Sequence, residues 1–168
     1  MVMTAITLEN GLNNMAIVDN EADAIDNFVT AWSDYAYNSS VLAIPATVGT
    51  LAGSLTAMRG ALVGMSGTDA GSGKWQDAIT AFWNVALAAA VSIWLIPPPN
   101  VLTIIAPIPG LSSIAATLDG IFAANTAGEL SLAAASTAIA NGIHPLQIGG
   151  IATITPPPPA VPFTAPLL

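Results

Sequence analysis

The feature that most restricts the possible folds of this chain is the scarcity and uneven distribution of its charged residues. Only 7% of the 168 residues are charged, against about 25% in an average soluble domain, while 54% are hydrophobic. Most acidic residues precede residue 40, none of residues 78–118 is charged, and after Glu129 only His144 can titrate. We therefore expect much of the surface to be covered by identical copies, partner proteins or lipid.

The net charge argues against two kinds of partner. Ten acidic residues stand against only Arg59 and Lys74, so the formal net charge is −8 at pH 7. Nucleic acids are bound by clustered Lys and Arg that neutralise phosphates, and anionic lipid surfaces attract the same residue types. We expect neither nucleic-acid binding nor electrostatic binding to lipid.

The chain contains no cysteine, which excludes disulfides, thiol catalysis and Cys-ligated metals. The first residues, MVMTAITLENG, lack a basic segment followed by an apolar run, so we expect no secretory signal there.

Helical spacing of apolar residues predicts a mainly α fold of about five helices packed as a bundle-like domain. Asn20 suits the N-cap of the first helix, and Pro45 suits the first turn of the second. Pro97–99 end the third, and Gly142 and Pro145 mark the end of the last. The expected helices cover residues 20–37, 45–65, 75–96, 111–124 and 131–143.

Prolines and β-branched residues predict extended structure in two places. Residues 101–105 follow a proline run and suit a short strand, and residues 146–155 suit a strand or an arm. Residues 156–159 are all proline, and the apolar chain end has no regular pattern. We therefore expect a helical domain of residues 1–145 and a short β or extended, Pro-rich C-terminal arm of residues 146–168, which docks on a neighbour or folds back.

Interface candidates come from small residues and exposed apolar ones. On one helix, glycines four apart would allow close helix contact, although a weak helix that tolerates glycine is the alternative. Tryptophans are common interface anchors, although large core residues are the simpler interpretation. The candidates are Gly49, Gly53, Gly60, Gly64, Trp83, Trp94, Ile151, Ile154 and Phe163.

The segment 75–96 allows two interpretations. Residues 78–96 carry no charge, and Trp75 and Trp94 would lie about 28 Å apart on one helix, close to the thickness of a hydrocarbon core. However, small and polar residues recur every fourth position, and no Lys or Arg flank is present at the far end. Burial in protein is favoured, and membrane contact remains the alternative.

The sequence offers little for chemistry, so we expect no catalytic residue, no cofactor and no metal. His144 beside a proline is typical of a capping or packing residue, although a triad with Ser131 or Ser136 and Asp119 would have to use it. The acids at positions 19, 21 and 23 alternate as in a calcium loop, but the required Gly and Glu are missing. Residues 66–74 lack the spacing of a phosphate-binding loop.

Two stretches of the chain combine motifs of a familiar kind. Residues 121–155 contain Phe122 and Asn125, then Ser131-Leu132, Ala138-Ile139 and Ile143-His144, followed by a Thr- and Ile-rich segment and a Pro-rich end. Residues 79–84 have the sequence ITAFWN. Both stretches resemble the minor structural proteins of tailed-bacteriophage virions.

The resemblance implies a non-catalytic component of the tail or baseplate that is assembled in the host cytoplasm. Its partners would be identical copies and other virion proteins, held through hydrophobic contacts and the apolar arm. The alternative is a small membrane-inserting protein, either holin-like or membrane-penetrating.

Overall fold

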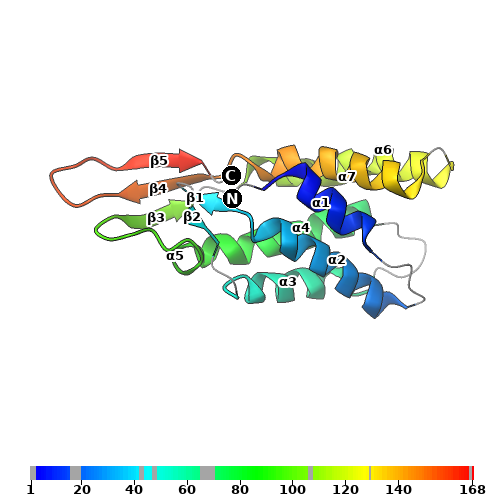
Figure 1. The fold of residues 1–168 in the computed structure, drawn as a ribbon, viewed down its shortest axis with the longest axis horizontal. Helices are drawn as coiled ribbons and strands as arrows, with labels where there is room; N and C mark the ends of the chain where they lie inside the picture. The colour runs from blue at the N-terminus through cyan, green and yellow to red at the C-terminus, as the bar shows by residue number, and fades with distance from the viewer. Residues whose placement is uncertain are drawn as a thin grey trace.

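The computed structural model describes residues 3–15, 20–41, 44–46, 49–64, 71–105, 108–128, 130–166 and 168. The helices gather in one part of an elongated molecule, and a sheet projects at the opposite end (Figure 1). The prediction of a mainly α fold with bundle-like packing is confirmed.

Seven α-helices and one short 3-10 helix make up the helical part of the described chain. The helices are α1 (Ala5–Asn13), α2 (Glu21–Ala36), α3 (Ala52–Leu62), α4 (Ser72–Ala88), α5 (Ala90–Ile93), η1 (Pro109–Ser113), α6 (Ile114–Thr126) and α7 (Leu132–Gln147).

The strands form two small antiparallel sheets, one of two strands and one of three. β4 is the central strand of the larger sheet, with β3 on one side and β5 on the other. The strands are β1 (Ser40–Val41), β2 (Ile44–Pro45), β3 (Val101–Ile105), β4 (Ile151–Thr155) and β5 (Phe163–Pro166).

The register of the larger sheet brings two turns together. Val101 lies opposite Thr155, and Ile154 lies opposite Phe163. The connection that enters β3 and the connection between β4 and β5 therefore lie at the same end of the sheet, far from most helices (Figure 1).

Helix α2 is confirmed where the sequence predicts it. The Asn20 side chain accepts a hydrogen bond of 2.9 Å from the backbone N–H of Asp23, which satisfies one of the free donors at the helix start. Ile25, Phe28 and Trp32 are buried on one face.

Helix α1 is an element that the sequence patterns above do not predict, because nine residues with two buried leucines give a weak periodic signal. Its start is capped by Thr4, whose hydroxyl accepts a hydrogen bond of 3.2 Å from the Thr7 N–H. A Cβ at Gly11 would lie 2.8 Å from the Cβ of Ala31, so α1 and α2 cross too closely for any larger residue there.

The core of the helical part is aromatic. Trp32 is completely buried, with its ring centroid 5.3 Å from that of Tyr35 and 5.9 Å from that of Phe82, both edge to face. The indole N–H of Trp83 donates a hydrogen bond of 2.5 Å to Oε1 of the buried Gln147 near the end of α7.

The prediction that Pro45 begins a helix is wrong. Ile44 and Pro45 form β2, in which Pro45 lies opposite Ser40. The expected helix 45–65 is shorter and begins at Ala52, after Gly49, whose φ of +88° lies outside the helical region.

Two other predicted helix boundaries also need correction. The expected helix 75–96 begins earlier, at Ser72, and is interrupted at Ala89 between α4 and α5. Helix α7 continues through Pro145 to Gln147. Pro145 has no backbone N–H to donate to the Asn141 carbonyl, and Asn141 lies on an exposed face of the helix.

The strand predicted at residues 101–105 is confirmed as β3, and part of residues 146–155 forms β4. The expected division between residues 145 and 146 falls inside α7, and β4 is paired with β3 from the middle of the chain.

Candidate interaction surface

Two proline-rich turns form the end of the larger sheet that points away from the helices. They comprise residues 95–101, which lead from α5 into the first residue of β3, and residues 156–163, which lead from β4 into the first residue of β5. A backbone hydrogen bond of 3.2 Å from Ala160 N–H to the Pro157 carbonyl closes a tight turn in the second segment. We call these two turns the apolar end.

Large apolar side chains of the apolar end are exposed to solvent. Val161 is 81% exposed and Phe163 is 43% exposed, and Leu95 and Val101 are also exposed. Most prolines of both turns are exposed as well. Val101 lies opposite Thr155 and Phe163 lies opposite Ile154, so these two side chains share one end of the sheet but lie on its two faces.

No charged side chain belongs to this part of the chain. Residues 78–118 and 130–168 contain no Asp, Glu, Lys or Arg, and His144 of α7 is the single titratable side chain among them. The described charged residues lie on α1 to α4 and α6, in the helical part of the molecule (Figure 1). The apolar end is therefore uncharged, whereas exposed apolar side chains also lie on the helices, such as Ile6, Val91 and Leu132.

The three interface candidates of the sheet differ in their surroundings. Phe163 lies at the apolar end, and Ile151, which is 47% exposed, lies at the other end of β4. Ile154 is completely buried beside Ala152 and Ala165 in the sheet's contribution to the core. Of the three, the structure places only Phe163 beside the other exposed side chains of the apolar end.

The sequence interpretation did not single out Leu95, Val101 or Val161. A signal for them existed, because the same proline runs that break the helices also produce turns, and turns lie on the surface. Their position at one end depends on the pairing of β3 with β4, which joins residues about 50 positions apart and which no local pattern contains.

The four glycine candidates do not share one helix, so this prediction is wrong. Gly49 precedes α3, and Gly64 follows it with a φ of +81°. A Cβ at Gly53 would lie 3.7 Å from Cγ1 of Val85 on α4, an ordinary contact, and a Cβ at Gly60 would meet nothing within 4 Å. No glycine of this set is needed for close helix contact within the chain.

The two tryptophan candidates are core residues of this chain. Trp83 and Trp94 have no exposed surface, so a partner cannot reach them in this fold. Trp83 binds Gln147, and the indole N–H of Trp94 donates a long hydrogen bond of 3.4 Å to the Ser39 carbonyl.

Two partly buried polar pairs connect distant helices. The Tyr35 hydroxyl lies 3.0 Å from Nδ1 of His144, joining α2 to α7. Burial raises the pKa of the Tyr35 phenol and lowers the pKa of His144, because both charged forms lose hydration there. The hydroxyl of Ser72 donates a hydrogen bond of 2.5 Å to Oδ1 of Asp119, joining α4 to α6.

These groups do not form a catalytic triad among the described contacts. His144 is paired with Tyr35, Asp119 accepts from Ser72, and the Ser131 hydroxyl caps α7 by accepting from the Ala134 N–H at 3.2 Å. Each group is used to join or cap helices. Within the described ranges, no three His, Cys, Asp or Glu residues lie close enough to hold a metal ion.

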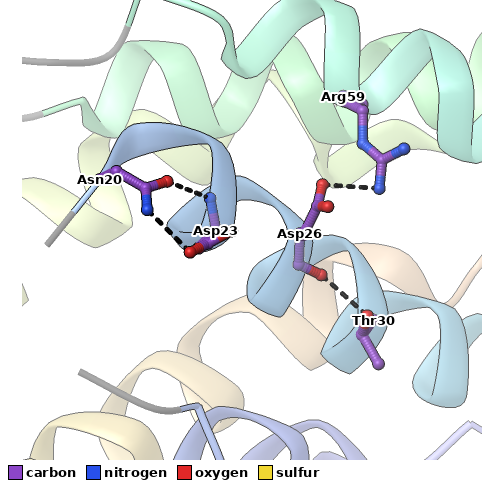
Figure 2. Close-up of polar contacts among 5 residues, drawn as sticks. All are labelled: Asn20, Asp23, Asp26, Thr30 and Arg59. Atoms are coloured by element: carbon purple, nitrogen blue, oxygen red, sulfur yellow. Dashed lines mark hydrogen bonds and ion pairs between the residues drawn. The ribbon is translucent and has the colours of Figure 1, made fainter. Parts of the chain in front are cut away.

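The acidic start of α2 forms local contacts, as Figure 2 shows. Asn20 and Asp23 bond reciprocally, with the Asn20 amide 2.7 Å from Oδ2 of Asp23. One turn later, Asp26 pairs with Arg59 of α3 at 2.7 Å, and both side chains are more than half exposed. Asp19 of the calcium-like spacing lies outside the described residues.

A surface groove of about 340 Å³ lies between α2 and α3. Thr30 and Thr56 in its wall donate their hydroxyl protons to the carbonyls of Asp26 and Ala52 on their own helices. Its remaining wall residues are Val29, Ser33, Ala52, Leu55 and Arg59.

Among the described helices, none combines the length and the apolar character that crossing a bilayer requires.

Comparisons of this chain with protein-family models, with curated proteins and with solved structures each give no match.

Proposed function

We propose that this chain is a non-catalytic structural component of a larger assembly, which it joins through its apolar end. The observation that carries the proposal is that exposed Val161 and Phe163 lie in a part of the chain without charged side chains, whereas the described charged residues all lie on helices. Val161 and Phe163 expose hydrocarbon to water in the isolated chain, and covering it on assembly releases that water favourably.

The non-catalytic character is supported by the use of the polar groups. The side chains most suited to chemistry form hydrogen bonds that join two helices. His144 pairs with Tyr35, and Ser72 donates to Asp119. A general base or nucleophile needs a partner group and a cleft that admits substrate, and the groove between α2 and α3 contains neither His144 nor Asp119.

We place the assembly in a bacteriophage virion, in its tail or baseplate. This part of the proposal rests on the resemblance of residues 121–155 and 79–84 to minor virion proteins. A small chain with an acidic body and one uncharged apolar end suits a part that is repeated in a symmetric particle.

The alternative of a membrane-inserting protein has less support. Its best candidate segment, residues 75–96, is divided at Ala89 into α4 and α5. Trp83 and Trp94 of that segment are completely buried against the rest of the chain.

The test is to add an epitope tag at the N-terminus of the chain in its gene, purify particles on a density gradient, and measure the tagged chain by quantitative mass spectrometry. We expect a constant number of copies per particle across the gradient peak. Recovery only in the free protein fraction or only in washed host membranes would contradict the proposal.

A further inference from the structure

β5 and Leu168 together bridge the two sheets of the molecule. β5 pairs along β4 of the larger sheet, with Ala165 opposite Ala152. Two residues after β5, the Leu168 N–H donates a hydrogen bond of 3.0 Å to the Ser40 carbonyl, and the Leu168 carbonyl accepts one of 2.7 Å from the Ser40 N–H. Ser40 belongs to β1 of the smaller sheet, so this segment lies on one sheet and is fixed to the other. We call β5 and Leu168 the strap.

We infer that the strap is a conformational device that opens as one unit while the helical part stays folded. In its closed state the strap covers the edge of β4. When it opens, the N–H and C=O groups of that edge become free to pair with another extended strand. This motion belongs to a single chain and does not depend on the proposed function.

Little buried apolar surface holds the strap in place. Ala165 is the one described strap residue that is buried, and its side chain is a single methyl group. Phe163, Thr164, Pro166 and Leu168 are all exposed. Burial of apolar surface is the main force that opposes the entropy of the chain, so this segment is held more weakly than the helices that form the core.

The backbone of the strap also has few contacts to lose. β5 is an edge strand and is therefore paired on one side only, with β4. Pro166 within β5 has no N–H to donate to that pairing. The opposite edge strand, β3, also contacts α5, whereas the main contact of β5 among the described elements is β4. β5 can consequently leave the sheet without displacing a helix.

Two buried hydroxyls lie where the strap is fixed to β1. The side chains of Ser39 and Ser40 are buried, and neither hydroxyl has a hydrogen-bond partner among the described protein groups. Such a group disfavours the closed state, because it would bond to water if water could reach it. When Leu168 separates from Ser40, water enters at the edge of β1 and can bond to the Ser40 hydroxyl. Opening is therefore favoured at the point where the strap is fixed.

Hydrogen exchange of the full chain, followed by NMR at individual N–H groups, tests the inference. We expect the N–H groups of the strap to exchange at least about a hundredfold faster than those of α2 and α4. Their exchange should depend only weakly on urea, because local opening exposes little surface. Exchange as slow as that of α4, with the urea dependence of global unfolding, would overturn the inference.

A disulfide across the strap tests whether it opens as one unit. Thr153 of β4 and Thr164 of β5 lie directly opposite each other, and opposite residues of antiparallel strands are close enough for a disulfide. The chain has no cysteine, so Thr153→Cys with Thr164→Cys can form only this bond within the chain. Oxidation should slow exchange of the Leu168 N–H about tenfold or more, and a reductant should restore it. Unchanged exchange at Leu168 would contradict opening as one unit.

Ser40→Ala tests the contribution of the buried hydroxyl. The substitution keeps both backbone hydrogen bonds to Leu168 and removes the unpaired group, so exchange of the strap should slow about tenfold. Ser112→Ala, at an exposed position of η1, is the matched control and should leave exchange of the strap unchanged. Equal or faster exchange in Ser40→Ala would overturn the role assigned to this hydroxyl.

Discussion

The helical part and the apolar end use the same kinds of side chain in opposite ways. In the helical part Trp32, Trp83 and Tyr35 are completely buried, because several helices pack around them from different sides. At the apolar end Val161 and Phe163 are exposed, because turns at the end of a three-stranded sheet have no element in front of them. Burial in this protein therefore depends on how many elements converge on a residue more than on its hydrophobicity.

The difference also separates stability from assembly. The helical part supplies most of the buried apolar surface and hence most of the folding free energy. The apolar end contributes little to the folded monomer, so its side chains are available for a partner. Substitutions in the two regions should consequently differ in size and in kind.

The largest expected effect is from Trp83→Ala. The substitution removes a fully buried indole and leaves Oε1 of Gln147 without its donor, so we expect a loss of about 3–5 kcal/mol in the free energy of unfolding. Urea unfolding followed by circular dichroism measures it. Phe163→Ala, the counterpart at the apolar end, should cost about 1 kcal/mol or less, and equal losses at both sites would remove the distinction between the regions.

Within the sheet, Ile154→Ala tests whether the strands share the core of the helical part. Ile154 is completely buried, and we expect a loss of about 2 kcal/mol or more. Ile151→Ala, on an exposed position of the same strand, should change stability by about 0.5 kcal/mol or less. A small loss at Ile154 in the same urea titration would mean that the sheet folds independently of the helices.

Gly110→Ala tests the close packing of η1 against α7. A Cβ at this position would lie 2.5 Å from the Leu146 carbonyl oxygen, so η1 and α7 must separate, and we expect a loss of about 1–3 kcal/mol. Gly120→Ala is the control, because a Cβ there meets nothing within 4 Å in α6. It should raise the melting temperature through a gain of about 0.5–1 kcal/mol.

Tyr35→Phe should lower the free energy of unfolding by about 1 kcal/mol, since it removes the hydrogen bond to His144 and keeps the ring. Thr164→Val, at an exposed position of β5, should be neutral within about 0.5 kcal/mol. Thermal unfolding of both variants measures the contrast. A neutral Tyr35→Phe would show that the pair adds no stability.

The smallest expected effect is a change of stability with pH that is caused by His144 of α7. Burial lowers the pKa of His144 in the folded protein, so the unfolded chain binds the proton more tightly and stability falls as pH drops below about 6.5. His144→Gln should flatten the melting temperature between about pH 7 and pH 5.5. The substitution keeps a polar side chain beside Tyr35, and a slope that persists in this variant would assign the titration to other groups.

Local patterns predicted most elements of this fold. The cap at Asn20 and the spacing of Ile25, Phe28 and Trp32 are enough to predict α2, and the β-branched run at residues 101–105 is enough to predict β3. The errors are the missed helix α1 and several breaks in elements. Pro45 suits a helix start and a strand edge equally well, and the pairing of β1 with β2 decides between them.

The candidate site was predicted less completely. Phe163 was identified as an interface candidate and lies at the apolar end, but Trp83 and Trp94 were identified with it and lie in the core. Sequence alone cannot distinguish an aromatic anchor for a partner from one for its own fold, because both have the same composition and spacing. Of the missed residues, Val161 is two positions from Phe163 in the sequence, whereas Val101 reaches the same end of the sheet only through the pairing of β3 with β4.

The sequence by itself determined the separation of charge, since no folding can move an acid into residues 130–168. It also determined that prolines stop the helices before β3 and divide β4 from β5. Only the tertiary structure decided which apolar residues are buried and that the two proline-rich turns form one end. The physical reason is that burial and proximity arise from contacts between residues far apart in the chain, such as Val101 with Thr155, whereas charge and backbone restriction belong to each residue.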